Sequence, residues 1–277
     1  MVGDLHVHTR DSDGSQTIEQ VVSQAQKIGL QYISITNHDC ITDISKVQCN
    51  NSIQIIPGVE LSAYDTTRKR RIHILCYLPQ DLKPIEAICN ITTHNRTEAG
   101  LEMAQRVSKL YPITVEDVLE IAKDSRCIYK QHIAKALMNA GYMTEIFSEL
   151  YDELFDFKSG SCIVNCKQPD VYEVLDAVKQ SGGISVMAHP FTYDSIDVLN
   201  ELLSQNLLDG IEVWSSKSSK AQEEYLMELV NKHKLIPTGG SDFHGAYSSR
   251  ISPLGAKRTP IHSIQSLLNF SNKKQEK

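Results

Sequence analysis

The chain has 277 residues, 41% of them apolar, and its 28 basic against 34 acidic residues give a formal net charge of −6. That length suits one large α/β domain, or one domain that carries a smaller insertion. The charge provides no broad cationic surface for nucleic acid or for an anionic membrane. No apolar run reaches the roughly 18 residues of a membrane span, and no signal peptide is visible, so we expect a cytoplasmic protein. Seven irregularly spaced cysteines favour reduced, structural thiols.

The first part of the chain alternates between short β-branched segments and an amphipathic helix. Leu5–His8 predicts a strand, and a helix follows from Thr17 to Ile28, because Thr17 and Gln20 form a capping box and Gly29 provides a stop. Further strands are predicted at 32–36, at 53–56 continuing into 59–61, and at 72–77. This alternation is typical of βα units around a mostly parallel sheet or barrel.

The middle of the chain, residues 85–165, has almost no strand signal. Helices are predicted from Thr114, over His132–Leu137 with a stop at Gly141, and over 145–157. We interpret this segment as a helical insertion, so that 1–84 and 166–277 form the barrel domain. Alternation then resumes, with helices at 169–180, 195–205, 217–233 and 261–270, strands at 184–188, 210–214 and 235–238, and a charged tail, 272–277, that we expect to fray.

Histidine and acidic residues fall at or just after the ends of the predicted strands. His6 and His8 are two residues apart on one strand and project to the same face, and Asp242 and His244 repeat that spacing near the C-terminus. The carboxyl ends of barrel strands converge on one mouth. Six imidazoles and three carboxylates are therefore expected around one cavity: His6, His8, Asp13, His38, Glu60, His73, His189, Asp242 and His244.

Such a cluster predicts metal ions. Without metal, the group repels itself when charged and leaves many buried polar atoms unsatisfied when neutral. One ion takes about four to six ligands, and a catalytic ion keeps one position for water. The candidates therefore favour two or three ions that share a bridging carboxylate.

The candidates lie in motifs that resemble the PHP (polymerase and histidinol phosphatase) family of metal-dependent phosphoesterases. The motifs are Asp4–Thr9 with Ser12–Gly14, Ile35–Asp39, Pro57–Ser62, His73–Tyr77, Ala188–Pro190 and Gly240–Gly245. The resemblance implies a distorted (β/α)7 barrel with a helical insertion. It also implies three divalent metal ions, with manganese expected first and iron or zinc as alternatives.

The resemblance also implies which residue binds which ion. His6, His8, Glu60 and Asp242 would bind the first ion, and Glu60 would bridge to a second ion held by His73 and His189. Asp13, His38 and His244 would bind the third. A hydroxide that bridges metal ions would attack phosphorus, and Asp39 would orient a ligand or shuttle a proton.

Within the family, the helical insertion resembles the branch that removes the 3′-phosphate of 3′,5′-bisphosphonucleotides and trims short RNA from its 5′ end. The implied substrate contacts are Arg96, Lys130 and His132, and His132 is also a catalytic candidate. Two residues depart from the pattern. Lys130 stands where arginine is expected and offers no bidentate fork to phosphate. Asn37 stands where relatives commonly carry aspartate, next to a candidate ligand.

Two other functions remain open from the sequence. A histidinol-phosphate-type phosphatase would share the metals and chemistry but act on a smaller substrate, for which the insertion is less suited. A non-catalytic, regulatory metal-binding module would be less expected to keep all nine candidate ligands. The expected partner is a nucleotide or a short oligonucleotide with a phosphate group, with no membrane and no extended nucleic-acid surface. The oligomeric state is open.

Overall fold

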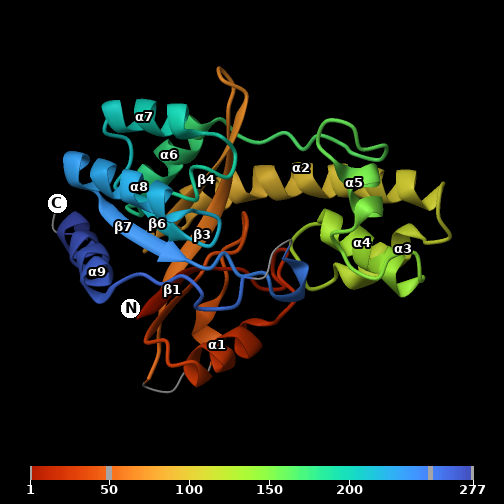
Figure 1. Ribbon diagram of the computed structural model, residues 1–277, viewed down its shortest axis with the longest axis horizontal. Helices are drawn as coiled ribbons and strands as arrows, with labels where there is room; N and C mark the ends of the chain where they lie inside the picture. The colour runs from red at the N-terminus through yellow and green to blue at the C-terminus, as the bar shows by residue number, and fades with distance from the viewer. Residues whose placement is uncertain (1, 48–51, 249–251, 276–277) are drawn as a thin grey trace.

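A computed structural model describes residues 2–47, 52–248 and 252–275 and shows a seven-stranded, nearly closed barrel (Figure 1). The strands follow chain order around it: β1 (Gly3–Val7), β2 (Tyr32–Ile35), β3 (Gln54–Asp65), β4 (Arg70–Tyr77), β5 (Ile184–Met187), β6 (Gly210–Ser215) and β7 (Ile236–Gly240). The gap between β7 and β1 is bridged just beyond the two strands, where the His8 amide donates to the Phe243 carbonyl at 2.8 Å. The predicted α/β class and seven-stranded barrel are confirmed.

The sheet is mixed where the sequence suggested mostly parallel strands. β3 is antiparallel to β4, and β4 is antiparallel to β5, whereas the other pairings are parallel. β3 is one continuous strand to Asp65 and turns directly into β4 without a helix. Arg68 closes that turn, because its backbone amide donates to the Asp65 carboxylate at 2.7 Å. Because of this hairpin, β4 runs antiparallel to both of its neighbours, and the barrel departs from a regular repeat of βα units.

Helices cover the outside of the barrel (Figure 1). They are α1 (Ile18–Lys27), α6 (Val171–Gln180), α7 (Ile196–Ser204), α8 (Lys220–His233) and α9 (Ile261–Gln275). The capping box predicted at Thr17 and Gln20 starts α1. The fraying predicted from residue 272 is wrong as far as Gln275, because Lys274 holds the end of α9 by an ion pair with Asp209 at 2.9 Å. Residues 276–277 lie outside the described residues.

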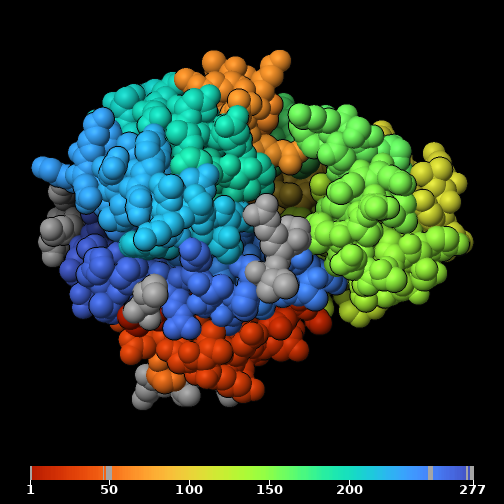
Figure 2. Space-filling model, in the orientation of Figure 1, coloured from red at the N-terminus to blue at the C-terminus, as the bar shows by residue number. Residues whose placement is uncertain are grey.

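The middle of the chain forms a helical lobe beside the barrel (Figure 2). Its helices are α2 (Lys83–Ser108), α3 (Val115–Ile121), α4 (Lys130–Asn139) and α5 (Glu149–Phe155). Ile85 and Ile88 pack into the barrel core, whereas Met103 and Val107 pack into a second core inside the lobe. The change of core thus falls within α2. The division of the chain at residues 85 and 165 stays a prediction.

Gly100 sets how α2 meets the segment that leads into α4. A Cβ at this position would lie 2.6 Å from Cβ of Ile128 and 2.9 Å from its carbonyl oxygen. Only glycine allows this approach without displacement of Ile128. The contact fixes the start of α4, and with it Lys130, relative to α2.

The sequence led us to expect no membrane span and reduced, structural cysteines. No helix in the described part of the chain is both long and apolar enough to cross a membrane. The described cysteines are free, and all but Cys166 are buried. Cys49 lies outside the described residues.

Candidate metal centre and the cavity above it

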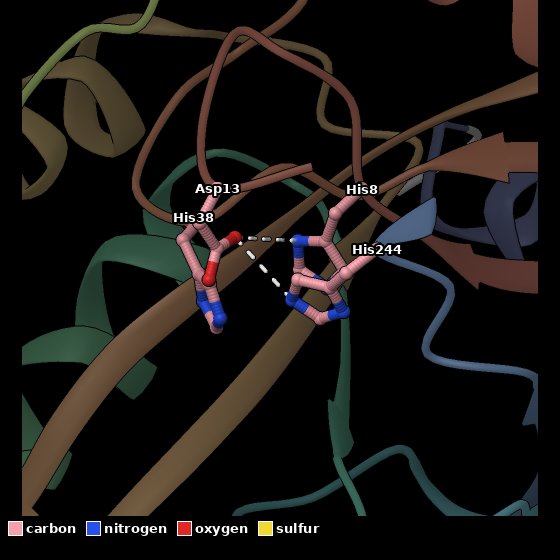
Figure 3. Close-up of side chains that lie close together, drawn as sticks. All are labelled: His8, Asp13, His38 and His244. Carbon is pink, nitrogen blue, oxygen red and sulfur yellow. Dashed lines mark ion pairs between the residues drawn. The ribbon is translucent and has the colours of Figure 1, made fainter. Parts of the chain in front are cut away.

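The candidate ligands come together at one end of the barrel. Eight of the nine, all except His189, form three groups, in each of which the possible ligand atoms lie within 4.8 Å of one another. Two groups are His6, His8, Glu60 and Asp242, and His38, Glu60 and His73. The third is His8, Asp13, His38 and His244 (Figure 3). Because Glu60, His8 and His38 each belong to two groups, the groups form one connected centre.

Glu60 lies in the middle of this centre. Its Oε1 is 2.7 Å from Nδ1 of His73 and 3.0 Å from Nε2 of His189. Its Oε2 is 3.0, 3.1 and 3.2 Å from ring nitrogens of His6, His8 and His38, in that order. A carboxylate with both oxygens among histidine nitrogens suits a bridge between ions.

Many of these atoms are buried and close together without being hydrogen-bonded. No hydrogen bond is made, within the described residues, by His6 Nε2, both ring nitrogens of His8, Asp13 Oδ1, His38 Nδ1, Glu60 Oε2 and His189 Nδ1. Unsatisfied buried polar atoms are costly and rare in proteins. Imidazole nitrogens and carboxylate oxygens are common ligands of divalent transition metals. The residues therefore fit divalent cations.

The backbone at the barrel mouth is adapted to hold these side chains. Gly240 allows β7 to pass His6, because a Cβ there would lie 2.4 Å from the His6 amide nitrogen. His189 and Asp242 both follow strands and have φ angles of 26° and 52°, in the left-handed region that is unfavourable for most residues. Such strain is concentrated at functional sites.

Charges in the centre shift the pKa values of its members. Burial would raise the pKa of Glu60, but His38, His6 and His73 hold it well below its usual range. Burial likewise opposes the charged form of His8, but the adjacent carboxylates of Asp242 and Glu60 raise the pKa of its imidazole to about 9. The carboxylates are therefore in the ionised form that metals bind.

Two residues that the sequence did not single out contact the candidate ligands. Glu212 on β6 is fully buried; its Oε1 pairs with His6 Nδ1 at 2.9 Å, and its Oε2 accepts from the His189 backbone amide at 2.8 Å. Lys217 pairs with Asp242 at 2.5 Å. A single Glu in a strand or Lys in a loop carries no local signal of such a role. Only the barrel geometry brings them to the centre.

Asn37, the departure from the family pattern, is fully engaged. Its side-chain oxygen accepts from the Thr9 amide at 2.7 Å and from Ser12 Oγ at 2.8 Å. Its side-chain nitrogen donates to Thr9 Oγ1 at 2.8 Å and to Thr42 Oγ1 at 2.7 Å. An aspartate carboxylate has no hydrogen to donate, so the asparagine matches the hydroxyls that surround it.

Asp39 joins the barrel to the helical lobe. Its carboxylate accepts from the Ser62 amide at 2.8 Å and from Ser62 Oγ at 2.7 Å. Arg96 on α2 donates through Nη2 to Asp39 at 2.8 Å and to Ser62 at 2.9 Å, whereas its Nε is buried without a hydrogen bond. The carboxylate thus has partners on two sides, and the predicted catalytic role of Asp39 stays a prediction.

A cavity of about 250 Å³ lies between the barrel mouth and the helical lobe. Asp13, His38 and His73 line it from the barrel, and Arg96, Lys130 and Gln131 line it from the lobe. Gln131 donates to Asp13 at 3.2 Å and Tyr129 donates to the His38 carbonyl at 3.2 Å, so the lobe touches the centre directly.

The three predicted substrate contacts are placed differently. Arg96 and Lys130 line the cavity, but His132 is not among the lining residues. His132 is buried, and its Nδ1 accepts from the Tyr129 amide at 3.2 Å, which caps the start of α4. Burial lowers the pKa of His132 to about 4, so its ring is neutral at pH 7. A direct contact between His132 and substrate stays a prediction.

A barrel with a mouth of histidines and carboxylates defines a metal-dependent hydrolase class. The family model described as PHP domain matches residues 4–164, and the chain belongs to the PHP family. It is accordingly a metal-dependent phosphoesterase.

Curated relatives match most of the chain. The phosphoribosyl 1,2-cyclic phosphate 1,2-diphosphodiesterase of Eggerthella lenta is 35% identical over 89% of this chain and 95% of its own length. The 5′-3′ exoribonuclease Rnm of Escherichia coli is 27% identical over 88% of this chain and 85% of its own. The 3′,5′-nucleoside bisphosphate phosphatase of Chromobacterium violaceum is 25% identical over 87% and 86%.

Solved structures share the fold. A protein from Bifidobacterium adolescentis assigned as a metal-dependent phosphoesterase superposes with a TM-score of 0.86 at 29% identity, over 98% of this chain and 96% of that chain. An amidohydrolase from Chromobacterium violaceum gives a TM-score of 0.76 at 22% identity, over 96% and 97%. The second likeness supports the fold alone.

Proposed function

We propose that this protein hydrolyses a phosphoester on a nucleotide or ribose phosphate that carries a second phosphate, with 3′,5′-bisphosphonucleotides as the first candidate substrate. The observation that carries the proposal is the cavity itself. One wall has a dense cluster of metal-type ligands, and the other wall has Arg96 and Lys130. Short RNA with a 5′ end is a further candidate, because a relative is named as a 5′-3′ exoribonuclease.

The proposed ligands belong to three divalent ions, with manganese expected first. His6, His8, Glu60 and Asp242 would bind one ion, His73 and His189 with Glu60 a second, and Asp13, His38 and His244 a third. Support comes from the close grouping of all these residues except His189, from the 3.0 Å approach of His189 to Glu60, and from the buried atoms without hydrogen bonds. Bound divalent ions would neutralise charge on phosphoryl oxygens and lower the pKa of water toward about 7.

The remaining residues would orient the ligands and the substrate. Glu212 holds the imidazole of His6 in one orientation and fixes the backbone of His189. Arg96 keeps Nη2 on Asp39 and would add the positive charge of its guanidinium to the wall of the cavity. Lys130 supplies a point charge to the same cavity. The lobe excludes bulk water from this wall and strengthens these charge interactions.

A cyclic phosphodiester of ribose phosphate is a second candidate substrate. The Eggerthella lenta relative with this activity matches 95% of its own length at 35% identity, above the nucleoside bisphosphate phosphatase at 25%. Both substrates are sugar phosphates with one reacting phosphoester and one other phosphate. The same cavity would therefore serve either.

The test is a side-by-side assay of purified protein with Mn²⁺. The substrates are 3′,5′-bisphosphoadenosine, phosphoribosyl 1,2-cyclic phosphate, short 5′-phosphorylated RNA and histidinol phosphate. We expect wild type to turn over one of the first two substrates. The His244→Ala variant should lose both that turnover and bound metal. Preferred turnover of histidinol phosphate would support the small-molecule alternative. No turnover of any substrate by protein with measured metal would support the non-catalytic module.

A further inference from the structure

We propose that Arg71 forms, with Lys130, a second anion subsite that binds the non-reacting phosphate of the substrate. This inference rests on the proposed function and names a residue that no sequence motif indicated. Arg71 lies on β4 two residues before His73, so both side chains project from the same face of the strand. Both line the cavity.

Arg71 differs from its neighbouring arginines in having no acidic partner. Arg68 pairs with Asp65 at 3.1 Å, and Arg70 pairs with Asp194 at 3.2 Å. The Arg71 guanidinium makes no ion pair or side-chain hydrogen bond to any residue in the described ranges 2–47, 52–248 and 252–275. It rests over the ring of Phe157, 4.1 Å from the ring centre. An aromatic face holds the group in place and leaves its N–H donors free.

Lys130 is held in a similar way across the cavity. Its Nζ donates to the Phe155 carbonyl at 3.4 Å and lies 5.6 Å from the ring centre of Tyr151. Its side chain is half-buried and forms no ion pair with a carboxylate of the described chain. Two cations that line one cavity without acidic partners repel each other, and an anion between them removes that repulsion.

The two cations come from different parts of the molecule. Arg71 belongs to the β3–β4 hairpin and Lys130 to the first turn of α4, while Phe157 follows α5. Figure 2 shows a hollow between the lobe and the barrel. A phosphate bound between Arg71 and Lys130 would therefore also hold the lobe to the barrel. Lys130 stands where the family resemblance implies arginine and lacks a bidentate fork, which the planar guanidinium of Arg71 supplies.

The test compares substrates that differ only in the second phosphate. Wild type, Arg71→Met and the control Arg70→Met are assayed with 3′,5′-bisphosphoadenosine and adenosine 3′-monophosphate. We expect Arg71→Met to lower kcat/KM for the bisphosphate by about 10- to 100-fold, mainly through KM, and to leave the monophosphate unchanged. Arg70→Met should behave as wild type. Arg71→Lys keeps the charge and should show a smaller loss than Arg71→Met. It replaces Arg71→Met in the comparison if Arg71→Met does not fold.

Equal losses on both nucleotides, or no loss on either, would overturn the subsite. If wild type turns over neither nucleotide, 3′,5′-bisphosphonucleotides fail as substrates, and wild type and Arg71→Met are then titrated with the same two nucleotides by calorimetry. The subsite still predicts that wild type binds the bisphosphate at least about tenfold more tightly than Arg71→Met does, with equal binding of the monophosphate. Equal binding of the bisphosphate to both proteins would reject the subsite independently of turnover.

Discussion

The two walls of the cavity are built on different principles. On the barrel wall, side chains from strand ends are buried and crowd one another, with Glu60 oxygens within 3.2 Å of ring nitrogens of several histidines. Around the rest of the cavity, Lys130 of the lobe is held by a carbonyl oxygen and an aromatic ring, and Arg71 at the start of β4 is held by an aromatic ring. The first arrangement suits metal ions and the second suits a substrate phosphate. The candidate metal ligands thus differ from the proposed phosphate contacts in how they are held, even where both kinds lie on one strand, as His73 and Arg71 do on β4.

The difference also explains where the chain tolerates departures from the family pattern. Asn37 lies behind the barrel wall and satisfies four hydrogen bonds to its neighbours. Lys130 lies on the lobe wall, where its position depends on Phe155 and Tyr151 rather than on the metal ligands. Changes to the candidate metal ligands should therefore affect bound metal and kcat, and changes to Lys130 or Arg71 should affect KM.

The largest effect is expected at Glu60. Glu60→Gln removes the charge shared by the histidines around it, so bound metal should fall and kcat should drop by at least about 10³-fold. Metal content by elemental analysis and single-substrate kinetics check this outcome. Glu102→Gln, on the exposed surface of α2, is the control and should keep both. A Glu60→Gln protein with full metal content and normal kcat would contradict the assignment of the barrel wall.

A smaller loss is expected at Glu212. In Glu212→Gln, one of the two carboxylate oxygens is replaced by an NH2 group. This group would face either His6 Nδ1 or the His189 backbone amide, so the hydrogen bond that the oxygen accepted there would be lost. Metal affinity should fall by about 10- to 100-fold. Competition with a chelator measures it, and Glu224→Gln on the exposed face of α8 is the control. Unchanged metal affinity would show that Glu212 does not orient the ligands.

Gly100→Ala tests the support of the lobe wall. A helix-interior alanine is normally favoured over glycine by about 1 kcal/mol. Here the new methyl would collide with Ile128, so we expect the free energy of unfolding to fall by about 1–3 kcal/mol. Urea denaturation of the full chain measures this change. Glu98→Ala, at an exposed position of α2, should change it by less than about 0.5 kcal/mol. A stabilised Gly100→Ala protein would mean that α2 and Ile128 lie far enough apart to accept the methyl group, which would contradict the close contact at Gly100.

The smallest effect is a pH dependence of selectivity. Burial, helped by Arg71 and Arg96 and opposed by Asp156 and Asp152, lowers the pKa of Lys130 to about 8. Lys130 is therefore cationic below pH 8 and loses its charge above it.

The quantity to measure is kcat/KM for 3′,5′-bisphosphoadenosine divided by kcat/KM for adenosine 3′-monophosphate, because this ratio cancels titration of the metal centre. It should fall by up to about tenfold between pH 7 and pH 9 in wild type. In Lys130→Met the ratio should be low and independent of pH. A flat ratio in wild type would remove Lys130 from recognition of the second phosphate.

Local sequence patterns predicted most of the strands and helices, the family and the set of candidate ligands. Alternation in strands and the spacing of apolar residues in helices are local properties, and the motifs around His6, Glu60 and Asp242 are short and specific. The confirmed barrel and helices follow from them. The role of each candidate ligand stays a prediction.

Tertiary structure alone decided the contacts between distant segments. Glu212 meets His6 only because β6 and β1 lie on the same barrel. Among the arginines of the β3–β4 hairpin, Arg71 is the one that lines the cavity because the strand face and the register with β3 place it there. The ring of His132 caps the start of α4, a role that its motif did not indicate, and its contact with substrate stays a prediction. Packing and register are properties of the whole chain, so no local pattern encodes them.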